Sequence, residues 1–363
     1  MKSERQSNFE SMRIVCIFMV VVYHFVLYNG IFATEYNAKT LLGLIFTSGG
    51  AIAADYAFIC VSAYFLLEMK KKPILKRFFS TGFQILTMYL LRLIVIRGLY
   101  GFHTNNIFLE DMIMKGAWWF GYCYLILLLI YPILNKIIDL IPLAWLLLIC
   151  GILGIWVCVN WISDRVNLFH DMVMFLFVYF SMGFMKRKKY KTFLGFKNRR
   201  RTFVLIYLLC YLLVFATCIS LKNNVRLDAE TSGILVTRLV GKYFILQAVM
   251  GFCVFFLFRH IQMRYHLWIN RISKATFFIF LMHETVMGVF WRFGFANGNT
   301  LMYCSIKTFL LWLIIYIICC YIVGGVIYLI YEKTVQPLID KAIDVLNQTR
   351  FIRRIEELYQ KIS

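Results

Sequence analysis

Apolar runs of about twenty residues recur along the whole chain, and this pattern limits the fold more than any other feature. A helical run of that length crosses the roughly 30 Å hydrocarbon core of a membrane. Of the 363 residues, 61% are hydrophobic, against roughly 45–50% in soluble domains. No stretch shows the alternating pattern of an outer-membrane barrel strand. The sequence therefore predicts an all-α integral membrane protein.

The expected fold is a bundle of about ten transmembrane helices with an amphipathic C-terminal helix. The spans are expected at 12–28, 43–67, 78–97, 117–134, 142–160, 168–185, 202–220, 239–258, 275–293 and 303–330. Residues 1–333 then form one polytopic transmembrane domain. In the tail, 334–363, Leu338, Ile339 and Ile343 share one side of a helical wheel and Asp340 lies on the other. This pattern is typical of a helix on the inner leaflet.

Lysine and arginine orient these spans. With both termini in the cytoplasm, 28 of the 39 basic residues fall on the cytoplasmic side, as the positive-inside rule requires. The net charge of +21 then reflects topology and contact with membrane lipids, so nucleic-acid binding is not expected. The eleven cysteines mostly fall inside spans without metal-ligand spacing, and no metal site is expected.

Arg13 and His24 lie eleven positions apart at the head of the first span. At about 100° per residue, their side chains diverge by roughly 20° and are separated by about 16 Å along the helix axis. Both therefore lie on one face. A neutral imidazole is a suitable general base for a hydroxyl group, whereas an arginine binds phosphate. The pair matches the length of a phosphopantetheine arm, although Arg13 alone also fits an ordinary membrane anchor.

Three further ionisable residues are expected deep in the spans, where such groups are costly and usually functional. Asp55 either fixes a helix pair through polar neighbours or holds a histidine. Glu284 either orients an imidazole or compensates the nearby Arg292. His283 precedes Glu284, and adjacent residues on a helix point about 100° apart. We therefore expect that His283 and Glu284 do not both face one point squarely.

Four ordered stretches carry a family resemblance. They are the Arg13-x10-His24 spacing, GGAIAADYAFICVSAYFLL (49–67), WWFGYCYLILLLIYPILNK (118–136) and ISKATFFIFLMHE (272–284). Together they resemble the membrane acyltransferase-3 family, whose bacterial members O-acylate cell-surface glycans and related acceptors. The resemblance covers about residues 8–330. The sequence departs from the family pattern at Ala63, usually glycine, and at Phe280, usually tyrosine.

The resemblance implies catalytic roles for particular residues. Arg13 and His24 match the family's essential pair, and His283 matches its late histidine, which Glu284 follows here. We therefore expect these four residues to be catalytic.

The resemblance also implies a binding site for coenzyme A. Relatives often carry two arginines, separated by two residues, after the second span, where this sequence has Lys76 and Arg77. Together with Arg13, these residues are expected to bind acetyl-CoA, the acyl donor and co-substrate.

The acceptor is expected at the outer end of the bundle. Trp118, Trp119 and Tyr122 stand at the outer end of the fourth span. They form either an interfacial aromatic belt or a platform for sugar rings. We assign these three residues and Asp55 to substrate binding.

The implied function is a membrane O-acyltransferase in the bacterial cytoplasmic (inner) membrane. It would move an acyl group, most simply acetyl, from cytoplasmic acyl-CoA to a hydroxyl of an envelope or extracellular polysaccharide or its lipid-linked precursor. The alternative is a proton-coupled secondary transporter or flippase, in which His24, Asp55 and Glu284 form a proton relay.

Overall fold

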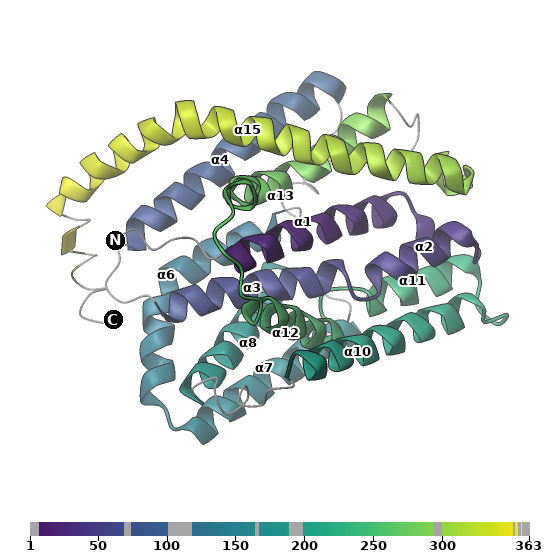
Figure 1. Cartoon of the computed structure of the whole chain (residues 1–363), viewed down its shortest axis with the longest axis horizontal. Coiled ribbons are helices and arrows are strands. Elements are labelled where there is room, and N and C mark those ends of the chain that lie inside the picture. The colour runs from purple at the N-terminus through teal and green to yellow at the C-terminus, as the bar shows by residue number, and fades with distance from the viewer. Residues whose placement is uncertain are drawn as a thin grey trace.

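The computed structural model describes residues 7–68, 74–100, 118–163, 167–188, 199–293 and 300–350, together with 353, 354 and 357. Within these ranges all regular structure is helical. Figure 1 shows the helices packed into one bundle. The long uninterrupted helices are α1 (Ser7–Tyr28), α4 (Ile74–Tyr100), α6 (Trp119–Leu140), α7 (Leu143–Ser163), α8 (Leu168–Arg187), α10 (Arg199–Lys222), α13 (Leu267–Phe293) and α15 (Ile306–Gln348).

Nine segments among the described residues are long and apolar enough to span a membrane. One of them, Ala38–Leu67, contains two consecutive helices, and a shorter apolar helix, α12 (Ile245–Arg259), follows α11. The nine segments and α12 correspond in order to the ten expected spans. The all-helical membrane fold expected from the sequence is confirmed.

The second expected span is divided into two helices, and the residues around the break are buried. It consists of α2 (Ala38–Thr47) and α3 (Ala51–Leu67), separated at residues 48–50. The carbonyl groups freed by the break receive hydrogen bonds from Gln247 Nε2 to Ser48 O at 3.1 Å and from Tyr207 OH to Gly49 O at 2.8 Å. Irregular backbone inside a membrane protein requires such internal partners. The break fixes where Asp55, in the second turn of α3, enters the interior.

A second break replaces the expected span at 239–258. The short helix α11 (Ala229–Leu239) and α12 are separated by residues 240–244, so the span begins later than expected. Tyr56 OH donates to Lys242 O at 2.8 Å, and Gln247 Nε2 donates to Leu239 O at 3.3 Å. This non-helical segment carries Lys242 and Tyr243 into the bundle.

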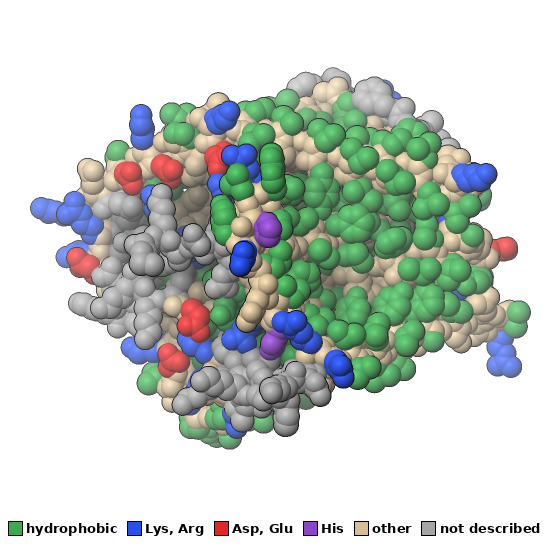
Figure 2. Space-filling model, viewed as in Figure 1, with side chains coloured by type: hydrophobic (Ala, Val, Ile, Leu, Met, Phe, Trp, Pro, Cys, Tyr) green, Lys and Arg blue, Asp and Glu red, His purple; other side chains and the backbone are tan. Residues whose placement is uncertain are grey.

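The helix that carries Arg13 and His24 occupies the centre of the molecule. In Figure 1, α1 lies between α3 and α13, and its residues Ile17, Val20 and Val21 are fully buried. The outer helices instead expose apolar side chains, such as Ile155 of α7 and Leu209 of α10. Figure 2 shows hydrophobic side chains gathered over the centre and right of one face, as expected of a surface in contact with lipid.

The two ends of the bundle differ. At the end where α1 begins, Lys186 of α8 donates to Leu67 O of α3, and Arg187 donates to Ile138 O of α6 at 2.9 Å. We call this the N-terminal end. The opposite end holds η1 (Ile31–Ala33) and α11, and we call it the cavity end. Figure 1 shows that α1 begins and α15 ends at the N-terminal end.

The last helix runs farther than expected. The 43 residues of α15 pass without interruption through 333 and 334, where we expected the transmembrane domain to end and a separate tail to begin. At about 1.5 Å per residue, this helix is roughly 65 Å long, so it extends beyond a bilayer core. In the tail, Ile339 and Ile343 are buried, whereas Leu338 and Val345 are exposed. Residues 351, 352, 355, 356 and 358–363 of the tail lie outside the described residues.

Candidate active site

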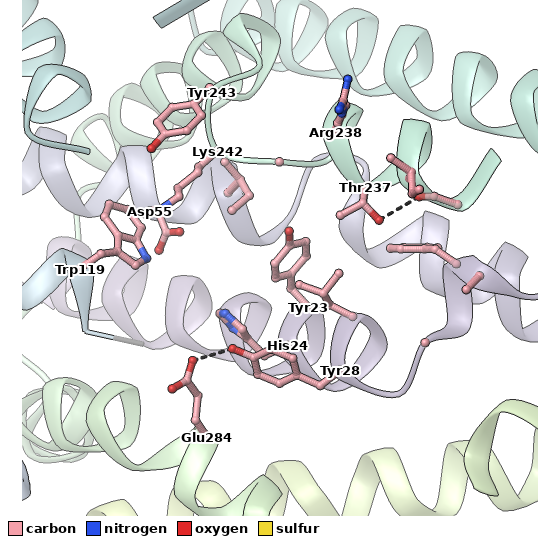
Figure 3. Close-up of a pocket in the computed structure, with 18 of the residues that line it drawn as sticks. Tyr23, His24, Tyr28, Asp55, Trp119, Thr237, Arg238, Lys242, Tyr243 and Glu284 are labelled. Atoms are coloured by element: carbon pink, nitrogen blue, oxygen red, sulfur yellow. Dashed lines mark hydrogen bonds between the residues drawn. The ribbon is translucent and has the colours of Figure 1, made fainter. Parts of the chain in front are cut away.

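A cavity of about 830 Å³ lies inside the cavity end of the bundle. The helix parts that line it all lie toward that end, including the second half of α1, the start of α3 and of α6, and the end of α7 and of α13. Its lining contains three carboxylates, from Asp55, Glu230 and Glu284, and the imidazole of His24. Figure 3 shows this arrangement.

His24 presents an unprotonated nitrogen in this cavity. Its Nδ1 lies 2.9 Å from Val20 O, one turn back on α1. Since a carbonyl oxygen only accepts, Nδ1 carries the proton, and a neutral ring then has its lone pair on Nε2. The helix thus fixes the tautomer that a general base needs.

His283 stands directly against His24. The two ring centroids are 4.7 Å apart. His283 Nδ1 donates to Phe280 O, so this ring also has its lone pair on Nε2. His283 Nε2 is buried and has no hydrogen-bond partner among the described residues. Two imidazole lone pairs therefore face the same small volume.

Glu284 completes this group and is held by two partners. Arg92 Nη1 of α4 lies 3.1 Å from Glu284 Oε2, and Tyr28 OH donates to Oε1 at 2.6 Å. Arg92 and Glu284 are 5% and 9% exposed, so this is a buried ion pair. Glu284 therefore pairs with Arg92, whereas the sequence analysis considered Arg292 or an imidazole as its partner.

The expectation that His283 and Glu284 would not both face one point is wrong. A nitrogen from His24, a nitrogen from His283 and a carboxylate oxygen of Glu284 all lie within 4.8 Å of one another. Both side chains of α13 are long enough to reach the same neighbour on α1 despite their different directions. This is also a set of groups able to hold a metal ion, but the guanidinium of Arg92 already supplies the positive charge at Glu284.

A second polar group lies on the opposite wall. Lys242 Nζ lies 2.7 Å from Asp171 Oδ1 and 4.2 Å from the centre of the Trp119 ring. Tyr243 OH donates to Asp171 Oδ1 at 2.7 Å. Asp55, 5% exposed, lines the cavity beside this group. No hydrogen bond or ion pair joins its carboxylate to another described residue, so neither role considered for Asp55, helix pairing or holding a histidine, is seen here.

Arg13 shares the α1 face with His24 but does not line the cavity. Its Nη1 lies 3.0 Å from Glu10 Oε1, and its side chain is 28% exposed at the N-terminal end. Ile17 and Val20 stand between the two residues on that face and are 0% and 1% exposed. The face is therefore filled with packed side chains between the cation and the imidazole.

Lys76 and Arg77 begin α4 at the N-terminal end and are exposed. Lys76 Nζ lies 4.0 Å from Asp344 Oδ1 of α15. Figure 1 shows α1 and α4 beginning at the same end, and neither Arg13 near the start of α1 nor Lys76 and Arg77 near the start of α4 lines the cavity.

Only one of the three aromatic residues assigned to the substrate, Trp119, lines the cavity. One face of its ring is occupied by Lys242. Trp118 is buried under the guanidinium of Arg92, which lies 5.5 Å from its ring centre. Tyr122 is half-buried outside the lining. A flat platform of these aromatics for sugar rings is thus not present.

The sequence analysis missed Arg92, Tyr28, Lys242 and Asp171. Arg92 had a clear signal, because it is a charged residue in the middle of the expected span 78–97. Lys242 and Asp171 lie near the ends of expected spans, where charges are common. For Tyr28, the only indication in the sequence is its position one helical turn after His24.

Fold and cavity together define an integral membrane protein with ionisable groups gathered inside a helical bundle. The chain belongs to the acyltransferase-3 family: the family model, described as an acyltransferase domain, matches residues 6–331. No curated protein and no solved structure matches the chain. The family resemblance stated from the four motifs is confirmed, and the protein is a membrane acyltransferase.

Proposed function

We propose that this acyltransferase moves an acetyl group from cytoplasmic acetyl-CoA to a hydroxyl of an envelope or extracellular polysaccharide, or of its lipid-linked precursor, in the bacterial cytoplasmic membrane. The observation that carries the proposal is His24, whose Nε2 lone pair stands at a cavity large enough for a sugar ring. An imidazole in this state is suited to take a proton from a hydroxyl group.

The proposed reaction is a direct transfer. His24 Nε2 takes the proton of the acceptor hydroxyl while the oxygen attacks the thioester carbonyl carbon. The carbon–sulfur bond then breaks, the new ester forms, and the proton passes from His24 to the departing thiolate. The products are the acetylated acceptor and free coenzyme A.

Glu284 and His283 support the charge that develops on His24. When His24 gains a proton it becomes a cation beside the Glu284 carboxylate, which Arg92 and Tyr28 hold in place. The free Nε2 of His283 accepts a hydrogen bond from the same proton. Preorganised groups of this kind stabilise a transition state because they need no rearrangement as charge develops.

The donor is proposed to approach from the N-terminal end. Arg13, Lys76 and Arg77 supply positive charge for the phosphates of coenzyme A. The pantetheine arm follows the α1 face toward His24, about 16 Å away along the axis. Since Ile17 and Val20 fill that face, their side chains must part as the arm enters.

Substitution of His24 tests this proposal. We expect His24→Ala to lower acetyl transfer by about 10²- to 10⁴-fold, the usual contribution of a general base. The measurement compares the alkali-labile acyl mass of envelope glycans from cells with the wild-type chain, the variant or no chain. His260→Ala is the matched control, because His260 lies at the end of α12 outside the cavity lining.

The outcomes separate the alternatives. Normal glycan acylation with His24→Ala inserted in the membrane would contradict the proposal. Acceptor uptake into vesicles that does not depend on acetyl-CoA would favour the transporter or flippase. Acetyl label retained on His24 in the absence of acceptor would show transfer through an acyl-imidazole in place of direct transfer.

A further inference from the structure

Asp55 is a buried carboxylate that receives no hydrogen bond from the part of the chain that the structure describes. It is 5% exposed and lines the cavity, yet no described residue forms a hydrogen bond or ion pair with it. Buried polar groups are almost always hydrogen-bonded, because burial without a partner is costly. The remaining source of a donor is therefore whatever fills the cavity, either solvent or a substrate that displaces it.

Lys242, the cation near Asp55, is paired with Asp171. Lys242 acts on Asp55 electrostatically, but its ammonium lies 2.7 Å from Asp171 Oδ1 and over the Trp119 ring. Tyr243 OH also donates to Asp171 at 2.7 Å. This network fixes Lys242 and leaves the Asp55 oxygens open toward the cavity.

Asp55 and the reactive imidazole belong to one space. Both line the same cavity, Asp55 from α3 and His24 from α1. Tyr23 also lines this cavity, and its ring centroid is 5.3 Å from that of His24. Figure 3 shows Asp55, Tyr23 and His24 around the same part of the cavity. An acceptor held there meets both groups.

We propose that Asp55 binds a second hydroxyl of the acceptor and so determines which hydroxyl is acylated at His24. This inference rests on the proposed acyl transfer and adds a specificity-determining residue to it. The ligand class is a ring that carries at least two hydroxyls. A hydroxyl suits Asp55 in either protonation state, because it donates to a carboxylate and accepts from a carboxylic acid.

Three small acceptors that differ in one group test the subsite with the purified full chain and acetyl-CoA. They are cis-1,2-cyclohexanediol, cyclohexanol, which lacks the second hydroxyl, and cis-2-aminocyclohexanol, which replaces it with an ammonium. The readout is kcat/KM for O-acetylation of each. For the wild-type chain, we expect the diol to exceed cyclohexanol by about ten- to a hundredfold, the usual effect of a hydrogen bond to a charged group.

Two substitutions locate the preference at Asp55. Asp55→Ala should bring the diol and cyclohexanol close to equal. Asp55→Asn, which is nearly the same size and keeps an accepting oxygen, should retain part of the preference. Glu35→Gln is the control, because Glu35 is an exposed carboxylate near the cavity end that does not line the cavity, and it should keep the wild-type ratio. The ratio does not depend on how much of each variant folds.

Three results would overturn the proposal: a wild-type chain without a diol preference, an Asp55→Ala variant that keeps it, or a preference for the aminoalcohol, which would assign a cation site. Acyl-CoA cleavage that needs His24 but shows no diol preference would overturn only this inference. If His24→Ala cleaves acyl-CoA as fast as the wild-type chain, the proposed function itself is contradicted.

Discussion

At the scale of single residues, the Arg92–Glu284 pair decides how the reactive imidazole is held. Both groups are nearly fully buried and 3.1 Å apart. Removing one member of a buried pair leaves the other as an uncompensated charge. The pair also lies beside His24, because Tyr28 donates to Glu284 and a carboxylate oxygen of Glu284 lies within 4.8 Å of ring nitrogens of His24 and His283. Its loss should therefore affect both stability and activity.

We predict that Arg92→Met lowers the free energy of unfolding by about 3–5 kcal/mol, because it leaves Glu284 buried without a countercharge. The double variant Arg92→Met with Glu284→Gln should recover part of that loss. Thermal unfolding in detergent measures both. Lys274→Met is the control. Lys274 pairs with Glu332, both side chains are about 40% exposed, and exposed pairs contribute about 0–1 kcal/mol. Equal effects of Arg92→Met and Lys274→Met would contradict the role given to burial.

At the scale of elements, α12 and α3 approach so closely that only glycine fits between them. A Cβ on Gly251 would lie 2.3 Å from Tyr56 Cβ and 2.7 Å from Ala53 O. Tyr56 in turn holds the break before α12 through its bond to Lys242 O. This contact therefore sets the position of Asp55 and Lys242 relative to each other.

Gly251→Ala should destabilise the protein by about 1–3 kcal/mol, as overpacking does, and should lower acyl transfer because α12 is displaced from α3. Gly325→Ala is a matched control in the middle of α15, where an added Cβ meets nothing within 4 Å. It should be neutral or stabilising by up to about 1 kcal/mol, since alanine favours a helix. Melting temperature and acetyl transfer report both effects, and a silent Gly251→Ala would rule out the close contact.

Hydrogen bonds from one lysine join the elements at the cavity end. Lys222 Nζ of α10 donates to Phe32 O of η1 at 3.0 Å, to Ala229 O at 3.2 Å and to Ser232 Oγ at 2.9 Å. Gly233 of α11 is in backbone contact with η1, because a Cβ there would lie 2.4 Å from Phe32 O. The elements that border the cavity are thus joined to one another and to α10.

At the scale of the whole molecule, the charges and the cavity give the bundle a direction. Arg13, Lys76 and Arg77 lie near the starts of α1 and α4, at the N-terminal end, and the cavity lies toward the other end. The positive-inside rule predicts that the N-terminal end faces the cytoplasm. Donor and acceptor would then reach His24 from opposite sides of the membrane.

Cysteine labelling in intact cells tests this orientation. In a Cys304→Ser background, which removes a half-buried cysteine near the cavity end, we predict that Val225→Cys reacts with a membrane-impermeant maleimide. Val225 is fully exposed between α10 and α11. Arg264→Cys, exposed between α12 and α13 at the N-terminal end, should react only after permeabilisation. The reverse pattern would invert the proposed topology.

The sequence by itself determined the class of fold and the most distinctive pair of residues. Partition into a membrane depends on the composition of each segment, so the apolar runs specified the helices one by one. Helical periodicity placed Arg13 and His24 on one face without knowledge of any neighbour. Ordered motifs then indicated the family, which the match over residues 6–331 confirmed.

Only the tertiary structure decided which groups meet. The rotation of α4 and α13 about their axes brings Arg92 to Glu284, and no local pattern encodes that contact. The breaks at 48–50 and 240–244 place Asp55 and Lys242 in one cavity, because interhelical hydrogen bonds satisfy the freed backbone groups. Packing of distant segments against α1 also buried Ile17 and Val20, which the helix itself places between Arg13 and His24.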